Sequence, residues 1–177
     1  SLGQIALMDV FNNKFKKYKR KCAQILLTWD DFDNRKRYMN IRKTIDKILS
    51  MGAIPVINEN DVTSYDEIRF GDNDTLAALV ANLVEAEYLM ILTDQAGLFD
   101  KDPRTSKDAQ LIREGVAGDP QLESFAGPSG TLGRGGMLTK LQAAGKAARS
   151  GASTVILSGL ESGQLLEVLN GSFPGTL

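Results

Sequence analysis

Histidine is absent from this chain of 177 residues. Catalysis by Ser-His-Asp or Cys-His groups is therefore excluded within the chain, as is zinc held by histidine. Cysteine occurs once, at Cys22 in the apolar run CAQILLT, so no disulfide can form within the chain. We expect Cys22 to be an unreactive core thiol. Any chemistry must therefore use carboxylates, lysines, arginines, amides or a hard metal ion.

Long hydrophobic runs are also missing. No segment approaches the roughly 20 apolar residues of a membrane span, and the first residues lack the pattern of a signal peptide. Because a single cysteine suggests a reducing compartment, we expect a cytoplasmic protein. The formal net charge of -1 argues against a general nucleic-acid binder, although residues 14–21 (KFKKYKRK) form a local basic run. A solvated helix face is the simpler interpretation of that run.

The chain does contain alternating strand and helix patterns. Its 42% hydrophobic and 24% charged residues are ordinary for a soluble globular protein. Buried strands are predicted at residues 23–28, 53–58, 88–93 and 154–159, and helices at 2–15, 34–51, 75–84 and 137–149. The alternation predicts an α/β fold with a mainly parallel central sheet between helices, a three-layer αβα sandwich. We take residues 1–177 as one domain.

Polar residues follow the second predicted strand, where α/β proteins commonly bind ligands. Residues 58–74 (NENDVTSYDEIRFGDND) are rich in carboxylates and amides: Asn58, Glu59, Asn60, Asp61, Asp72, Asn73 and Asp74. These groups could hold the ammonium group of an amino acid, or organise lysines and magnesium near a phosphate. Turn formation would explain the same residues, and Asp72 and Asn73 could cap the helix that begins near residue 75.

Two further segments could bind a nucleotide. Thr93 and Asp94 close the third predicted strand, and Gly97 permits a turn after them. The glycine cluster of residues 130–136 runs into a predicted helix that carries Lys140 on its first turn. Glycines let a phosphate approach the backbone, and the helix amides and the lysine attract it. Because a lysine there opposes the helix dipole, we expect either a bound anion or exposure to water.

The spacing of these glycines matches neither the Walker A loop nor the dinucleotide-binding fingerprint. Taken in order, however, several segments of the chain resemble the bacterial glutamate 5-kinases of the amino acid kinase superfamily. The most specific are INEND, FGDND, LTDQAGLFDKDPR and GGMLTK. The resemblance covers nearly the whole chain and implies an amino acid kinase-like fold. It also implies transfer of the γ-phosphate of ATP to the side-chain carboxylate of L-glutamate, with Mg²⁺, as the first step of proline biosynthesis.

The resemblance implies roles for individual residues. Asp61 and Asn73 would hold glutamate, Asp74 would organise the catalytic lysines, and Lys140 would stabilise charge on the moving phosphoryl group. The nucleotide site would be lined by Thr93, Asp94, Arg134, Gly135, Gly136, Met137, Leu138, Thr139 and Lys140. No metal ligand is assigned. The resemblance also implies a homodimer or homotetramer, proline as a feedback inhibitor, and no nucleic-acid or membrane partner.

Two departures from the family pattern affect these expectations. Arg134 stands where the family usually has threonine, which could add a phosphate contact or alter the nucleotide loop. The family's kinase domain also begins with a strand and a glycine-rich loop bearing another phosphate-binding lysine, followed by a loop whose serine contacts glutamate. We do not find these segments before SLGQ, nor a C-terminal PUA domain. From these 177 residues alone we therefore expect weak or absent catalysis.

Two alternatives stay open at this point. One is a sister kinase of the superfamily that acts on acetylglutamate, aspartate or UMP. The other is a non-catalytic module that binds a nucleotide or an amino acid without transferring phosphate.

Overall fold

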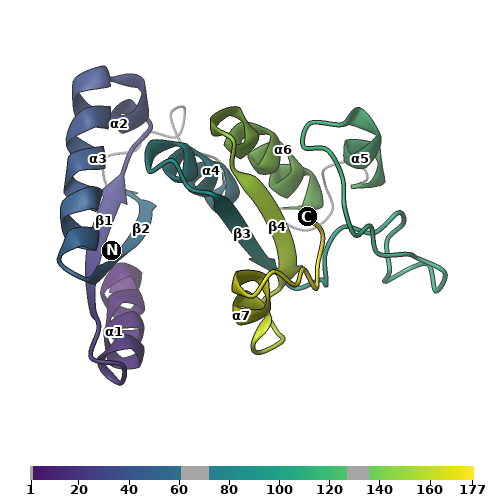
Figure 1. Cartoon of the computed structure of the whole chain (residues 1–177), viewed down its shortest axis with the longest axis horizontal. Coiled ribbons are helices and arrows are strands. Elements are labelled where there is room, and N and C mark those ends of the chain that lie inside the picture. Colours follow the sequence, from purple (N-terminus) through teal and green to yellow (C-terminus); the bar gives the residue numbers. More distant parts are fainter. Residues whose placement is uncertain (1, 61–71, 127–135) are drawn as a thin grey trace. The chain divides into compact units, whose positions relative to one another are not determined.

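The computed structural model describes residues 2–60, 72–126 and 136–177 (Figure 1). Its elements are α1 (Leu2–Lys16), β1 (Lys21–Leu27), α2 (Asp30–Asp33), α3 (Arg35–Ser50), β2 (Ala53–Glu59), α4 (Asn73–Leu83), β3 (Tyr88–Thr93), α5 (Pro120–Phe125), α6 (Met137–Ala147), β4 (Ser153–Ser158) and α7 (Gln164–Leu169). All four predicted strands and all four predicted helices are confirmed, with ends that differ by two residues or fewer. The contacts divide the chain into two compact units, Ser1–Leu76 and Ala77–Leu177. The single domain over residues 1–177 stays a prediction.

The first unit contains a parallel strand pair joined by a helix. β1 and β2 run side by side, with Lys21 opposite Ala53 and Leu27 opposite Glu59. α3 begins where it does because the Asn34 side chain accepts hydrogen bonds from the first-turn amides of Lys36 and Arg37. This unit therefore has the strand-helix-strand arrangement that the hydrophobic pattern predicted.

The second unit contains the other parallel pair. β3 and β4 run together from Tyr88 opposite Ser153 to Thr93 opposite Ser158. The main core cluster joins α4, β3, α6 and β4 through Ala78, Ala81, Leu89, Ile91, Leu141, Ala143, Ala147 and Ile156, among others. A smaller cluster packs β4 against α7 through Val155, Leu157 and Val168. Because neighbouring residues of β4 enter different clusters, helices cover both faces of this pair.

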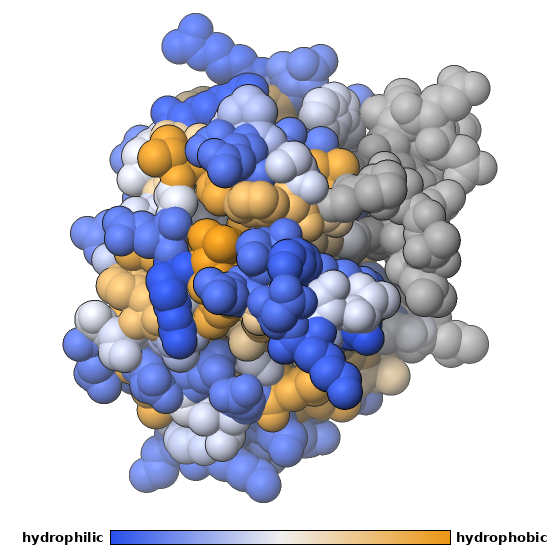
Figure 2. Space-filling model, turned by 90° about the vertical axis from the view of Figure 1, so that its right-hand side faces the viewer, coloured by the Kyte–Doolittle hydropathy of each residue, from blue (hydrophilic) through white to orange (hydrophobic). Residues whose placement is uncertain are grey.

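The surface mixes hydrophobic and hydrophilic residues (Figure 2). Figure 2 shows hydrophobic residues in small groups between hydrophilic ones on one face of the molecule. Scattered apolar residues of this kind are normal on protein surfaces. Within the described ranges, no helix has the length and apolar character needed to cross a bilayer.

Candidate active site

The carboxyl ends of β3 and β4 form one edge of the second unit. The Gly159 amide donates to the Thr93 carbonyl at 2.7 Å, so the two chains stay paired just beyond the strands. A Cβ built on Gly159 would lie 3.3 Å from Leu92 Cβ, which shows how closely they pass. The Thr93 hydroxyl donates to Asp94 Oδ1 at 3.1 Å. This edge therefore presents a hydroxyl beside an exposed carboxylate, at the strand end that the sequence predicted.

The start of α6 lies at the same edge. α6 packs on β3 and β4 and joins the amino end of β4 through only residues 148–152. A helix of 11 residues is about 16 Å long, close to the length of the strands that it covers. Its first residue, Met137, is therefore at the carboxyl ends of the strands. Of the two predicted nucleotide segments, 93–94 and 134–140, the structure brings residues 93–94 and the described residues 136–140 to one edge.

Gly136 precedes α6 and has no side chain with which to cap it. A Cβ built on Gly136 would meet no atom of the described residues within 4 Å. A helix N-terminus suits a phosphate, because the first-turn amides carry the positive end of the helix dipole. This geometry fits the nucleotide phosphates that the sequence predicted here.

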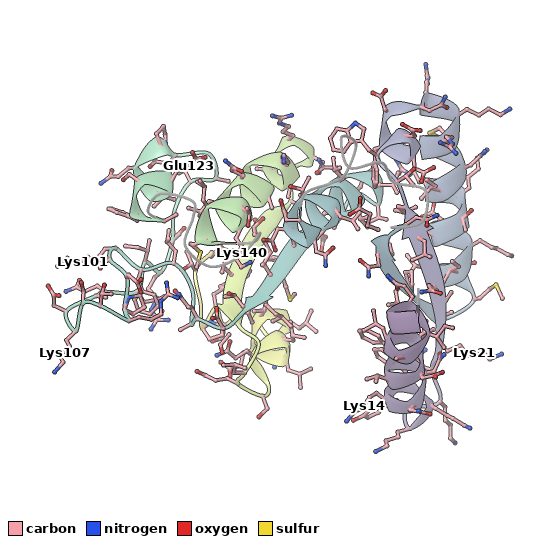
Figure 3. The ribbon with its side chains drawn as sticks, turned by 180° about the vertical axis from the view of Figure 1, so that it is seen from behind. Lys14, Lys21, Lys101, Lys107, Glu123 and Lys140 are labelled. Atoms are coloured by element: carbon pink, nitrogen blue, oxygen red, sulfur yellow. The ribbon has the colours of Figure 1, made fainter. Side chains whose placement is uncertain are left out.

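Lys140 is buried, with only 8% of its surface exposed. It shares the inward face of α6 with Ala144 and Ala147, one and two turns further along, and Figure 3 shows it on that helix. Of the two expectations for this lysine, exposure to water is therefore wrong. The expectation of a bound anion beside Lys140 stays a prediction.

Residues 72–74 lie at the start of α4 and belong to the first unit. Asp72 is the cap of this helix, since its Oδ1 accepts from the Thr75 amide at 2.6 Å and its Oδ2 from the Thr75 hydroxyl at 3.2 Å. Capping is thereby confirmed for Asp72. Asn73 and Asp74 occupy the first turn, where a carboxylate complements the helix dipole. Their predicted contacts with glutamate and with lysines stay predictions.

Some predicted residues cannot be placed together. Asp61, Arg134 and Gly135 lie outside the described residues. Asp74 belongs to one unit and Lys140 to the other, so a common site for both also stays a prediction.

Arg104 lies on an arm after β3, and its sequence context DPR is typical of a turn. Phe99 and Leu111 pair in an antiparallel bridge, and the intervening arm carries Asp102 and Arg104. The pKa of Arg104 is raised, and the largest cause is the hydrogen bond from its side chain to Asp102. The negative charges of Asp102 and Asp94 also raise it. Arg104 therefore lies within electrostatic range of the Asp94 carboxylate at the strand edge. The DPR letters were the only signal for it in the sequence.

The described residues offer no protein cage for a metal ion. Within residues 2–60, 72–126 and 136–177, no three His, Cys, Asp or Glu side chains are placed to hold one. Magnesium is commonly bound through substrate phosphates and only one or two carboxylates. Asp94 provides one exposed carboxylate at this edge, which fits Mg²⁺ held mainly by nucleotide phosphates.

Comparison with known proteins identifies close relatives. The chain is 56% identical to the glutamate 5-kinase of Thioalkalivibrio sulfidiphilus over 178 residues, covering 100% of this chain and 48% of that protein. It is 55% identical to the glutamate 5-kinase of Alcanivorax borkumensis, covering 99% of this chain and 47% of that one. The chain thus spans about half the length of the curated relatives that it matches.

Solved structures show the fold. Isopentenyl phosphate kinase of T. acidophilum, in a product complex, matches with a TM-score of 0.65 and 16% identity, over 98% of this chain and 65% of that one. UMP kinase of Bacillus anthracis matches with a TM-score of 0.66 and 13% identity, over 99% and 63%. The predicted fold class is confirmed. The family model described as "Amino acid kinase family" matches residues 1–158, and the chain belongs to that family.

Proposed function

We propose that this chain serves the ATP-dependent phosphorylation of the side-chain carboxylate of L-glutamate. The product is L-glutamyl 5-phosphate, and the reaction is the first step of proline biosynthesis in the cytoplasm. The observation that carries the proposal is the 55–56% identity to named glutamate 5-kinases along the whole chain. The solved neighbours are far less similar, at 13% and 16% identity, and support only the fold.

The chemistry suits a chain without histidine. A glutamate carboxylate oxygen attacks the γ-phosphorus, the bond from that phosphorus to the bridging β-oxygen breaks, and ADP leaves with that electron pair. The substrate is itself the nucleophile, so the protein must mainly position the reactants and supply positive charge. Mg²⁺ on the phosphates would neutralise part of their negative charge.

The proposed roles are those that the family resemblance implies. Lys140, buried at the start of α6, stabilises charge on the moving phosphoryl group. The segments 93–94 and 134–140 bind ATP. Asp61 and Asn73 hold glutamate, and Asp74 organises the lysines.

Three further proposals concern the whole protein and follow from the family resemblance. We infer that residues 1–177 belong to one kinase domain, that the protein forms a homodimer or homotetramer, and that proline inhibits it. Each can be examined separately, by limited proteolysis, by mass in solution and by inhibition kinetics.

The proposal is tested with the protein, Mg-ATP and hydroxylamine, which traps an acyl phosphate as a stable hydroxamate. Glutamate, aspartate, acetylglutamate and UMP are offered in parallel, and ADP release is measured with each. We expect hydroxamate and ADP with glutamate only, and loss of both in the Asp74→Asn variant. Turnover with another acceptor alone would replace the proposal by a sister kinase. Nucleotide binding without turnover by residues 1–177 would not separate a non-catalytic module from an incomplete kinase domain, and the same assay on a protein of the relatives' full length would decide between them.

A further inference from the structure

Residues 173–177 (FPGTL) form a strap along the outer edge of β4. Thr176 and Ile156 exchange backbone hydrogen bonds of 2.9 and 2.8 Å. On its other side, Leu177 exchanges backbone bonds with Arg113 and Gly115 at 3.0 and 2.9 Å. The strap therefore lies between β4 and the chain that returns from the charged arm at residues 111–115.

The Thr176 side chain joins this strap to the turn that follows β3. Its hydroxyl oxygen accepts a hydrogen bond from the Leu98 amide at 2.9 Å, and the hydroxyl donates to the Ile112 carbonyl at 2.6 Å. Thr176 is 5% exposed, so water cannot easily replace either partner. One buried hydroxyl thus holds both ends of the arm.

The contact has little free space. A Cβ built on Gly97 would lie 2.6 Å from the Thr176 hydroxyl oxygen and 2.9 Å from Leu111 Cδ1. A Cβ built on Gly175 would overlap the Ile156 carbonyl oxygen and lie 3.0 Å from the Ala96 carbonyl oxygen. Glycine at both positions lets the strap and the turn touch backbone to backbone. Because the fit is close, moving the hydroxyl would move the turn.

This turn belongs to the proposed nucleotide site. Leu98 follows Asp94 by four residues, and its own side chain is 1% exposed. That side chain enters the core cluster that contains Leu141, the neighbour of Lys140 on α6. The position of Leu98 therefore affects the positions of both segments at the strand edge, residues 93–94 and residues 136–140.

We propose that Thr176 is a positioning residue for the nucleotide: its hydroxyl fixes the turn at residues 94–98 so that Thr93 and Asp94 meet ATP in the right geometry. Thr176 itself does not touch the nucleotide. The inference rests on the proposed function, since that function supplies the nucleotide, and it adds a residue that lies 82 positions beyond Asp94 in the sequence.

The test compares three variants of the full protein. Thr176→Val keeps the shape of the side chain but leaves the Leu98 amide and the Ile112 carbonyl unpaired. Thr176→Ser restores the hydroxyl. Thr154→Val is the matched control, because Thr154 lies on β4 and its buried hydroxyl has no hydrogen-bond partner among the described residues.

Mg-ATP affinity is measured by calorimetry, and the KM for ATP and for glutamate by the hydroxamate assay. We expect Thr176→Val to weaken ATP binding by a factor on the order of 10 and to raise the KM for ATP. A factor of that size is on the scale of one of the two buried hydrogen bonds that the variant loses. The KM for glutamate should change less than about 2-fold in Thr176→Val. In Thr176→Ser and Thr154→Val, the ATP affinity and both KM values should also change less than about 2-fold. A merely structural role would not separate the two KM values.

Hydrogen exchange of the wild-type protein gives a readout that needs no variant to fold. The Leu98 amide should become more protected when ATP is bound, since the turn and the nucleotide would then order each other. Unchanged protection of that amide, or ATP affinity unchanged in Thr176→Val, would overturn the inference while glutamate phosphorylation still stood. If the wild-type protein bound no ATP, the proposed function would fail and this inference with it.

Discussion

Asp102 accepts hydrogen bonds from both Nε and Nη2 of Arg104, each at 3.0 Å. The Arg104 amide adds a third bond to the same carboxylate at 2.9 Å. A guanidinium group matches a carboxylate in this two-pronged arrangement, and the side-chain hydrogen bond is the largest cause of the lowered pKa of Asp102. Lys101 lowers the pKa of Asp108 on the same arm in the same way.

We predict that Asp102 titrates below its ordinary value of 3.8. A carboxyl group with a lowered pKa stabilises the fold at pH values above its ordinary pKa, and the contribution disappears as the pH falls through the lowered value. The arm should therefore be intact at neutral pH and loosen only in strong acid. Carboxyl-carbon NMR measures the midpoint, which Arg104→Gln should raise. Because both groups are exposed, the melting temperature should barely change. A midpoint at or above 3.8 in the wild type would contradict the prediction.

Loss of the buried Lys140 ammonium should affect catalysis more than folding. Lys140→Met keeps the aliphatic stem, so we expect kcat to fall by a factor on the order of 100 to 1,000, as for other groups that stabilise transition-state charge. Lys146→Met removes the same charge from the last turn of the same helix and should leave kcat within about 3-fold. Steady-state kinetics with both variants checks this, and equal losses in the two would refute a specific role for Lys140.

Gly136 offers a variant that should disturb the ligand but not the fold. Its φ of -71° suits alanine, and a Cβ there meets open space among the described residues. Gly136→Ala should cost less than about 1 kcal/mol of stability as a change of cap. It should weaken ATP binding by a factor on the order of 10, because a methyl group would occupy the approach to the helix amides.

Gly145→Ala is the matched control on the same helix. Its Cβ would lie no closer than 3.9 Å to any described residue beyond its own helix, so alanine should stabilise α6 by about 0.5–1 kcal/mol. Its ATP affinity should stay unchanged. Calorimetry and thermal unfolding measure both quantities, and unaltered ATP affinity in Gly136→Ala would argue against a phosphate at this helix.

Asp72 should matter for stability through its cap. Asp72→Ala removes the acceptor of the Thr75 amide and should lower the free energy of unfolding by about 1 kcal/mol. Asp72→Asn keeps an oxygen at that position and should lose much less. Urea unfolding measures the free energy of unfolding of the wild type, Asp72→Ala and Asp72→Asn. An Asp72→Ala variant as stable as the wild type would show that the cap is not needed.

The strands were predictable because their signal is local. Residues 88–93 and 53–58 are apolar runs bounded by turn residues, and β3 and β2 fall on them. The start of β1 at Lys21 was not predictable. It depends on backbone pairing with Ala53, and Lys21 has no hydrophobic side chain that would signal a strand. α5 and α7 have only six residues each, too few to show a helical period. Asp119 followed by Pro120 was nevertheless a usable signal for the start of α5.

The candidate site divides in the same way. Thr93, Asp94 and Lys140 were found because a strand end and a helix start are visible in the sequence. The burial of Lys140 was not, since it depends on which face of α6 packs against the strands. Thr176 was not predictable from the sequence, because its partner Leu98 lies 78 residues away and no local pattern connects them.

The unequal burial of β3 and β4 has a consequence for the evolution of this chain. Residues 155–158 of β4 are all buried, whereas along β3 the buried Leu89 and Ile91 alternate with residues that are more exposed. In a library of all single substitutions, β4 should tolerate almost nothing at four successive positions, whereas β3 should accept changes at every second one. Sequence drift among functional descendants would then accumulate in β3 while β4 stays nearly constant.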